Sequence, residues 1–177
     1  LHHFLPGTSV YSFVTAGCNL ACRYCQNWDI TKSRSTDTLA DTASPGDIAR
    51  AAAEAGCPSV AFTYNDPVVF LEYAADTADA CHAAGLRTVA VSAGYVLPGP
   101  REQLFRRMDA ANIDLKAFHE DFYVKVCGGH LAPVLETLEW LVQAGVWLEV
   151  TTLVVPGLND SDRELTKLAA WMVEHLG

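Results

Sequence analysis

Apolar and polar residues follow two alternating patterns along the chain. Short β-branched apolar runs are each followed by a longer run rich in Ala and Leu with helical spacing. This alternation predicts parallel strands joined by right-handed helical crossovers. The predicted strands span residues 9–16, 59–64, 87–93, 112–117 and 146–155, and the predicted helices span residues 47–55, 68–84, 101–109, 132–144 and 162–176.

Capping residues support these boundaries. Ser44 precedes Pro45, which gives an N-cap and a proline at the first helical position. Ser161 and Glu164 have the spacing of a capping box. Glycines that favour a left-handed C-cap follow three helical runs, at Gly56, Gly85 and Gly145. The order satisfies both a doubly wound sheet and a barrel-like (β/α) fold, and neither a G-x-G-x-x-G fingerprint after the first strand nor a P-loop is present.

Polar residues occupy alternate positions in the last two predicted strands. Asn112, Asp114 and Lys116 share one face of the fourth strand, and Glu149 and Thr151 share one face of the fifth. A parallel strand covered by helices on both sides should be almost entirely apolar. Two interpretations are open at this point. One is a solvated edge strand or an internal ion pair between Lys116 and Asp114, and the other is the polar lumen of a partial barrel that holds a ligand.

The predicted lumen would have its binding rim at the carboxyl ends of the strands, where ligands of such folds bind. Thr63 and Ser92 end the second and third predicted strands and would join this rim. The cysteines Cys18, Cys22 and Cys25 follow the carboxyl end of the first strand. Two independent features therefore indicate the same edge of the sheet.

Composition narrows the classes of partner. The chain has 177 residues, of which half are hydrophobic and 19% are charged, so it can bury the core of one domain. Its net charge of −9 argues against a nucleic-acid backbone as the main partner. No run of about 20 apolar residues predicts a membrane span, and the first residues do not resemble a secretory signal. Because the first residue is Leu, we expect the natural N-terminus to lie outside the sequence.

The six cysteines are distributed unlike a disulfide framework. Three are crowded into one loop, and Cys57, Cys81 and Cys127 are single, which predicts a reducing, cytoplasmic compartment. A structural zinc ion or a simple electron-carrying cluster requires four ligands, and only Cys127, after the fourth strand, is a plausible addition to the three. The alternatives are a zinc or electron-transfer module and a 4Fe–4S cluster that three thiolates hold, with one iron left open.

The cysteine loop resembles a known signature. The stretch GCNLACRYCQN, with Tyr24 before its third cysteine, resembles the motif of the radical S-adenosylmethionine (radical SAM) enzymes. Nearly the whole chain resembles the pyruvate formate-lyase activating-enzyme branch, and more closely the radical SAM member of the AmmeMemoRadiSam group, through the stretches AFTYNDPVVFLEYA, NIDLKAFHEDFYVKVCGGH and TTLVVPGLNDSD. The resemblance implies an α/β fold, a partial (β/α) TIM-like barrel. We expect residues 1–177 to be one radical SAM core domain, truncated at both ends, with a sixth strand missing.

The resemblance also implies a site. Cys18, Cys22 and Cys25 would hold a 4Fe–4S cluster. Asn65 and Asp66 lie where the family has a Gly-Gly-Glu stretch, and Gln26 departs from the Cys-His-Asn run of glycyl-radical activators. The residues implied to contact SAM are Tyr24, Asn27, Asn65, Asp66, Ser92, Asp114, Lys116 and Val154.

The implied activity is reductive cleavage of SAM to methionine and a 5′-deoxyadenosyl radical, which abstracts hydrogen from an unidentified substrate. The alternative within the family is activation of a glycyl-radical enzyme, and the implied electron donor is of flavodoxin or ferredoxin type. We interpret the segment from Cys127 to His130 as a glycine turn beside a buried cysteine rather than a substrate-side thiol. His119 could face the rim, and no general base is predicted.

Overall fold

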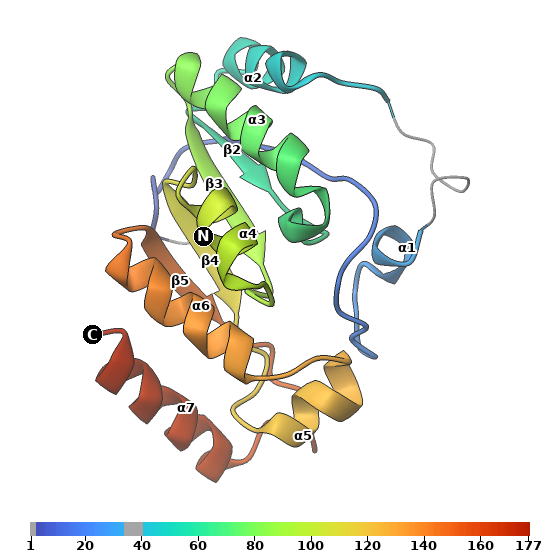
Figure 1. The fold of residues 1–177 in the computed structure, drawn as a ribbon, viewed down its shortest axis with the longest axis vertical. Coiled ribbons are helices and arrows are strands. Elements are labelled where there is room, and N and C mark those ends of the chain that lie inside the picture. The colour runs from blue at the N-terminus through green and yellow to red at the C-terminus, as the bar shows by residue number, and fades with distance from the viewer. Residues whose placement is uncertain (1–2, 34–40) are drawn as a thin grey trace.

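Five parallel strands form a single sheet in the order β1-β2-β3-β4-β5, without closing into a barrel (Figure 1). The computed structural model describes residues 3–33 and 41–177. The strands are β1 (Val10–Phe13), β2 (Ser59–Phe62), β3 (Arg87–Ser92), β4 (Ala110–Asp114) and β5 (Trp147–Thr151). The sequential order follows from the repeated βα unit, in which each crossover returns the chain beside the previous strand.

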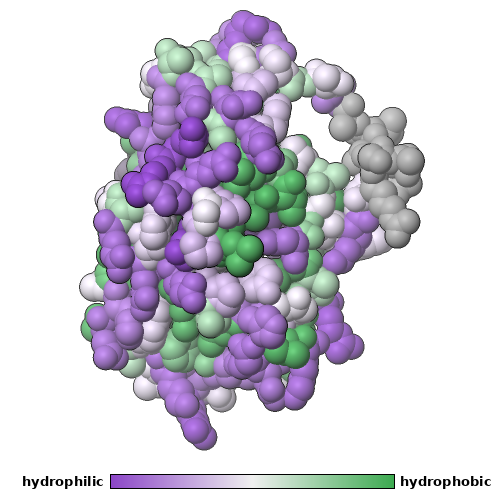
Figure 2. All heavy atoms as spheres, viewed as in Figure 1, coloured by the Kyte–Doolittle hydropathy of each residue, from purple (hydrophilic) through white to green (hydrophobic). Residues whose placement is uncertain are grey.

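The long helices lie together on one face of this sheet (Figure 1). They are α2 (Pro45–Glu54), α3 (Leu71–Ala83), α4 (Pro98–Phe105), α6 (Ala132–Gln143) and α7 (Asp162–His175). Their outer surface is largely hydrophilic, although hydrophobic side chains gather near the middle of the view (Figure 2). None of the helices in the described residues combines the length and apolarity needed to cross a bilayer.

Four short elements join the predicted ones. They are the helix α1 (Trp28–Thr31), the 3₁₀-helix η1 (Pro67–Phe70), the helix α5 (Glu120–Phe122) and the π-helix η2 (Tyr123–Cys127). Each is a single turn or less, too short to show a periodic pattern in the sequence. All four adjoin the carboxyl ends of the strands, so they shape the rim on which the site is built.

The two faces of the sheet differ as the strand pattern predicted. Ala111 and Ile113 on β4 are buried against the helices, where they join a core with Phe105 and Leu138. Asn112 faces the other way and accepts a hydrogen bond from Thr151 Oγ1 at 2.8 Å. The inner face is therefore polar on its last two strands, as expected for a lumen.

Several boundaries differ from the sequence prediction. Strand β4 begins at Ala110 and ends at Asp114, not at residues 112 and 117, because Ala110 and Ala111 pair with β3. Strand β5 ends at Thr151, well before residue 155. Helix α4 begins at Pro98, whose fixed φ suits the first helical turn. Lys116 consequently lies beyond β4 rather than within it.

The helix caps are largely as predicted. Ser44 and Asp47 form a reciprocal capping box, and Gly56, Gly85 and Gly145 all have positive φ. Ser161 accepts a hydrogen bond from the Glu164 amide, but the reciprocal half of this second box is absent. The carboxylate of Glu164 instead accepts hydrogen bonds from the Phe118 amide and from His119, and this ties α7 to the segment that follows β4.

The N-terminal segment crosses the inner face at the amino ends of the strands. Glu149 accepts hydrogen bonds from the amides of His3 and Phe4, at 3.0 and 3.2 Å. The Phe4 ring packs on Trp147, with ring centroids 6.2 Å apart. The charge of Glu149 is therefore satisfied by the chain itself, far from the carboxyl ends of the strands.

Candidate cofactor site at the carboxyl ends of the strands

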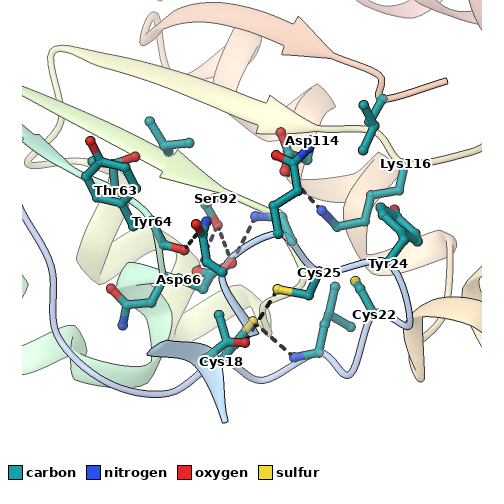
Figure 3. Close-up of a pocket in the computed structure, with 18 residues that line it drawn as sticks. Cys18, Cys22, Tyr24, Cys25, Thr63, Tyr64, Asp66, Ser92, Asp114 and Lys116 are labelled. Carbon is teal, nitrogen blue, oxygen red and sulfur yellow. Dashed lines mark hydrogen bonds and ion pairs between the residues drawn. The ribbon is translucent and has the colours of Figure 1, made fainter. Parts of the chain in front are cut away.

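A cavity of about 230 Å³ opens at the carboxyl ends of the strands (Figure 3). Its wall combines the cysteine loop after β1, the loop between β2 and η1, the end of β3, and the chain from Asp114 to Lys116. This volume lies a little below the usual range of ligand pockets. The two predicted clues, the cysteines and the polar strand ends, meet here.

The three loop cysteines all line this cavity. Cys18, Cys22 and Cys25 are free thiols and only partly buried. The Leu20 amide donates to Cys18 Sγ at 3.5 Å, and Cys25 Sγ lies 3.4 Å from Thr31 Oγ1 on α1. The first turn after the loop thus fixes the outer cysteine, and a backbone amide points at the inner one.

Without a bound cation, the surroundings favour protonated thiols. Burial raises the pKa of Cys18, and a hydrogen bond with Cys127 together with burial raises the pKa of Cys22. A buried thiol that loses its proton requires a compensating positive charge, which a metal supplies directly. The site is therefore suited to thiols that ionise when they bind metal.

The donor set fits an iron–sulfur cluster better than a single ion. Within residues 3–33 and 41–177, no three Cys, His, Asp or Glu side chains converge on one point where a metal ion could sit. A closed zinc site requires such convergence of four ligands. A cluster is bound by thiolates that each reach a different iron, so the ligands can be spread along one wall. Three thiols on one cavity wall meet this requirement.

Asn27 connects the cysteine loop to the loop after β2. It stands at the N-terminus of α1, but its side chain makes no capping hydrogen bond. Its amide instead donates to the carbonyl oxygen of Tyr64 at 3.0 Å. Tyr64 has a φ of +71° and a side chain that is 55% exposed at the cavity.

Asn65 and Asp66 are buried and held by the chain. Asn65 donates to Thr15 Oγ1 at 2.8 Å and accepts from the Thr15 amide at 3.2 Å. Asp66 accepts from the Ala93 amide at 2.8 Å and from Ser92 Oγ at 3.0 Å. Burial raises the pKa of Asp66, although these hydrogen bonds oppose it. The pair joins the ends of β1, β2 and β3 into one rigid rim.

Asp114 and Lys116 form the ion pair that one interpretation of the strand pattern predicted, and they also line the polar cavity that the other predicted. Lys116 Nζ lies 2.9 Å from Asp114 Oδ2, and both side chains line the cavity. Burial alone would lower the pKa of Lys116, but the negative charge of Asp114 outweighs it and the net pKa is raised. The ion pair therefore places an ammonium and a carboxylate side by side in the lumen (Figure 3).

The structure brings seven of the eight predicted SAM-contacting residues to the cavity wall or its rim. The exception is Val154, which does not line this cavity and is 48% exposed. Strand β5 ends at Thr151, and beyond it Leu153 lines the cavity in place of Val154. Thr31 and Tyr64 also line it. Tyr64 could have been predicted from its position in the stretch where the family has glycines.

The other candidate residues lie outside the cavity. His119 pairs with Glu164 at 2.8 Å, and His130 pairs with Glu120 at 2.6 Å. Cys127 is buried, as predicted, and does not line the cavity. Gly128, with a φ of +73°, ends the π-helix η2 and forms the predicted turn.

Comparison with known families distinguishes between a zinc or electron-transfer module and a three-cysteine 4Fe–4S site. The family model of the radical SAM superfamily matches residues 12–169. The chain belongs to the radical SAM superfamily. The resemblance drawn from the cysteine loop is confirmed. A zinc or electron-transfer module is correspondingly disfavoured.

Three proteins are similar in sequence to this chain. The uncharacterized protein MJ0808 of Methanocaldococcus jannaschii is 37% identical over 177 residues, which is all of this chain and 52% of that protein. Benzylsuccinate synthase activating enzyme of Thauera aromatica is 28% identical over 66% of this chain and 35% of its own length. Pyruvate formate-lyase-activating enzyme of Clostridium pasteurianum is 25% identical over 93% of this chain and 69% of its own. The chain spans about half, or less, of the first two proteins.

Solved structures show the same fold. Streptococcus suis SuiB bound to S-adenosylmethionine superposes with a TM-score of 0.73 at 13% identity, over 94% of this chain and 38% of that one. A domain of pyruvate-formate lyase-activating enzyme from Bacteroides vulgatus gives 0.61 at 15% identity, over 66% and 73% of the two chains. Five parallel strands in an open sheet thus fit a partial TIM-like barrel.

Proposed function

We propose that this radical SAM chain binds a 4Fe–4S cluster through Cys18, Cys22 and Cys25 and cleaves S-adenosylmethionine reductively at the same cavity. The observation that carries the proposal is that three free thiols line one cavity, and no fourth cysteine of the described residues lines it. Three thiolates on a four-iron cluster leave one iron without a protein ligand. A small molecule with amino and carboxylate groups can take that position.

The bound cluster would supply one electron to the sulfonium of SAM, so that a carbon–sulfur bond breaks to give methionine and a 5′-deoxyadenosyl radical. The part of the protein chain is to position SAM and to exclude water from the cavity. The rim formed by Asn65, Asp66 and Ser92 is rigid because each polar side chain bonds to another strand end. Such a rim holds a ligand in one orientation at little entropic cost.

The charged groups of the cavity match the functional groups of SAM. Lys116 presents an ammonium that attracts a carboxylate, and Asp114 beside it accepts hydrogen bonds from hydroxyl or ammonium donors. Tyr24 offers an aromatic face at the cysteine loop, and Asn27 orients the Tyr64 carbonyl. We assign SAM contacts to these side chains and to the Asn65–Asp66–Ser92 rim.

The cavity residues indicate the cofactors, and the candidate substrates come from the relatives and from the sequence. The names of relatives support activation of a glycyl-radical protein as a second candidate. Gln26 departs from the activator motif, so we favour hydrogen abstraction from another substrate. We further propose an electron donor of flavodoxin or ferredoxin type and, because all six cysteines are free, a reducing cytoplasmic compartment.

Anaerobic reconstitution tests this function. The wild-type protein, given iron and sulfide and then dithionite and SAM, should contain four irons per chain and release 5′-deoxyadenosine. Cys18→Ala, Cys22→Ala and Cys25→Ala should each lose most of the iron and the product. Cys57→Ala is the matched control, because Cys57 is buried after α2 and does not line the cavity. A wild-type protein that binds iron yet leaves SAM intact would overturn the proposal.

A further inference from the structure

A second cavity, here called the inner pocket, lies on the inner face of the sheet, toward the amino ends of the strands. Its volume is about 250 Å³, against about 230 Å³ for the cofactor cavity. Residues 4–8 of the N-terminal segment form one side of it. The other side is formed by side chains of β1, β2 and β3, which are Val10, Ser59, Ala61, Val89 and Val91.

Strand parity explains why the sheet side of the inner pocket is mostly apolar. Val91 on β3 is the register partner of Asn112 on β4, which faces away from the helices. Val89 lies two residues earlier on the same face, and its partner on β2 is Ala61. The middle of β2 and β3 is therefore apolar on the inner face, in contrast to the polar inner face of β4 and β5.

The N-terminal segment arches over this apolar surface. Glu149 on β5 accepts hydrogen bonds from the amides of His3 and Phe4, and the segment then enters β1 at the opposite edge of the sheet. Leu5 has a φ of +48°, in the region that L-residues avoid, and the Thr8 hydroxyl donates to its carbonyl at 2.7 Å. An arch that is anchored at both edges and strained in the middle keeps the space beneath it open.

The inner pocket adjoins the cofactor cavity, and its chemistry differs. Val91 lines both cavities. The cofactor cavity contains Asp66, Asp114 and Lys116, whereas no charged residue of the described chain lines the inner pocket. An apolar cavity of about 150 Å³ binds benzene, so the inner pocket has room for a larger ring or a branched alkyl group.

We propose that the inner pocket binds an apolar group of the substrate, a ring or a branched alkyl chain, and that the C–H bond attacked by the 5′-deoxyadenosyl radical lies next to this group. The inference rests on the proposed function. The cofactor cavity is smaller than a usual site for one ligand, so it has no room for SAM and a whole substrate together. Burial of the apolar group supplies affinity and leaves the reacting carbon at Val91, the wall that the two cavities share.

Deuterium transfer identifies the chemical class of the substrate. The radical takes one hydrogen atom from the substrate carbon, so a deuterated substrate gives deuterated 5′-deoxyadenosine. Cells of the organism that carries this protein are grown in deuterium oxide, and their extract is partitioned between chloroform–methanol and water. With SAM, dithionite and the reconstituted wild-type protein, the organic phase should supply deuterium to 5′-deoxyadenosine, as measured by mass spectrometry.

Variants that fill the pocket test its position. Val10 is 49% exposed at the edge of the inner pocket, so the ring of Val10→Phe can enter the pocket without overpacking the core. The deuterated fraction of 5′-deoxyadenosine should fall by about tenfold or more. Ala61→Leu fills the pocket from β2 and should give the same loss. Val173→Phe is the matched control, because Val173 is 76% exposed on α7 and lines neither cavity.

Benzene probes the inner pocket without turnover. Isothermal titration of the reconstituted wild-type protein with benzene should show saturable binding, and Val10→Phe should weaken that binding by about tenfold or more, whereas Val173→Phe should leave it unchanged. Absence of saturable binding to the wild type would show that the space beneath the arch accepts no apolar ligand, and the inference would be wrong.

The outcomes separate the inference from the proposed function. A wild-type protein that forms no 5′-deoxyadenosine overturns the proposed function and the inference with it. If the wild type cleaves SAM but receives no deuterium from the organic phase, only the inference is wrong. It is equally wrong if Val10→Phe and Ala61→Leu keep the deuterated fraction of the wild type.

Discussion

At the scale of single residues, Tyr64 shows how the site stores backbone strain. Its φ of +71° lies in the left-handed region that L-residues avoid. The side chain is 55% exposed, so packing does not hold it there. Asn27 binds its carbonyl, and the next residue, Asn65, is tied to Thr15 on both sides of its amide group. The surrounding hydrogen bonds thus force a conformation that Tyr64 alone would not adopt.

Releasing this strain should stabilise the protein. We expect the free energy of unfolding of Tyr64→Gly to exceed that of Tyr64→Ala by about 1 kcal/mol. The two variants differ only in the Cβ, and it is the Cβ that strains the left-handed backbone. The measurement is equilibrium urea unfolding of the iron-free protein under reducing conditions. Equal stability of the two variants would show that the turn carries no strain.

The sequence revealed the site residues that belong to a motif and missed those brought by tertiary contacts. The three cysteines follow from their spacing, and Asp114 follows from strand parity, whereas Lys116 lines the cavity from a position beyond the end of β4. The contact of the cysteine loop with the segment after β4, where the Ala21 amide donates to the Cys127 carbonyl at 2.7 Å, depends on the π-helix, a single turn without a pattern of its own. A contact between residues this far apart in sequence is set by packing and not by local propensity.

At the scale of elements, Asp109 connects the amino ends of the neighbouring strands β3 and β4. Its carboxylate accepts hydrogen bonds from the Thr88 amide at 2.9 Å and from Arg87 Nη1 at 2.7 Å. His82, near the end of α3, lies 3.0 Å away. One side chain thus joins α3, β3 and the residue before β4.

This arrangement predicts a pH dependence. Burial opposes it, but the hydrogen bonds from Thr88 and Arg87 hold the pKa of Asp109 below its ordinary value of 3.8. The stabilisation is therefore complete above about pH 4 and is lost as the pH falls through the lower folded-state value. Asp109→Asn should cost about 2 kcal/mol at pH 7, with the difference from wild type shrinking below pH 4.

Urea unfolding of both proteins between pH 7 and pH 3 measures this difference. Asp121→Asn serves as the control, since Asp121 pairs with Lys125 on the exposed surface and should matter little. A constant gap between wild type and Asp109→Asn across the range would show that Asp109 ionisation does not contribute.

The long elements could be predicted from the sequence because their periodicity reflects which face they bury. The boundaries could not, because tertiary pairing decides them. Ala110 and Ala111 have weak strand propensity, yet β3 recruits both. Residues 152–155 look like strand, yet in the described residues β5 ends at Thr151. Asn159 explains the change: it accepts from the Val155 amide and donates to the Leu153 carbonyl, which holds a turn.

At the scale of the whole molecule, the long helices cover one face of an open sheet and leave the other face free of long helices (Figure 1). The N-terminal segment covers the amino ends of the strands on that face, and the cysteine loop covers the carboxyl ends. A polar cavity remains between strand ends that are joined by buried side chains. The architecture thus holds a fixed charge pattern beside three thiols, which is what binding SAM next to a cluster requires.

The central claim is that one iron of the cluster has no protein ligand and is available to SAM. The most direct measurement is the electron paramagnetic resonance spectrum of the reconstituted, dithionite-reduced wild-type protein before and after SAM is added. The account predicts that saturating SAM shifts the g-values of the reduced cluster, because a ligand joins the open iron. An unchanged spectrum, with SAM binding shown by equilibrium dialysis, would contradict it.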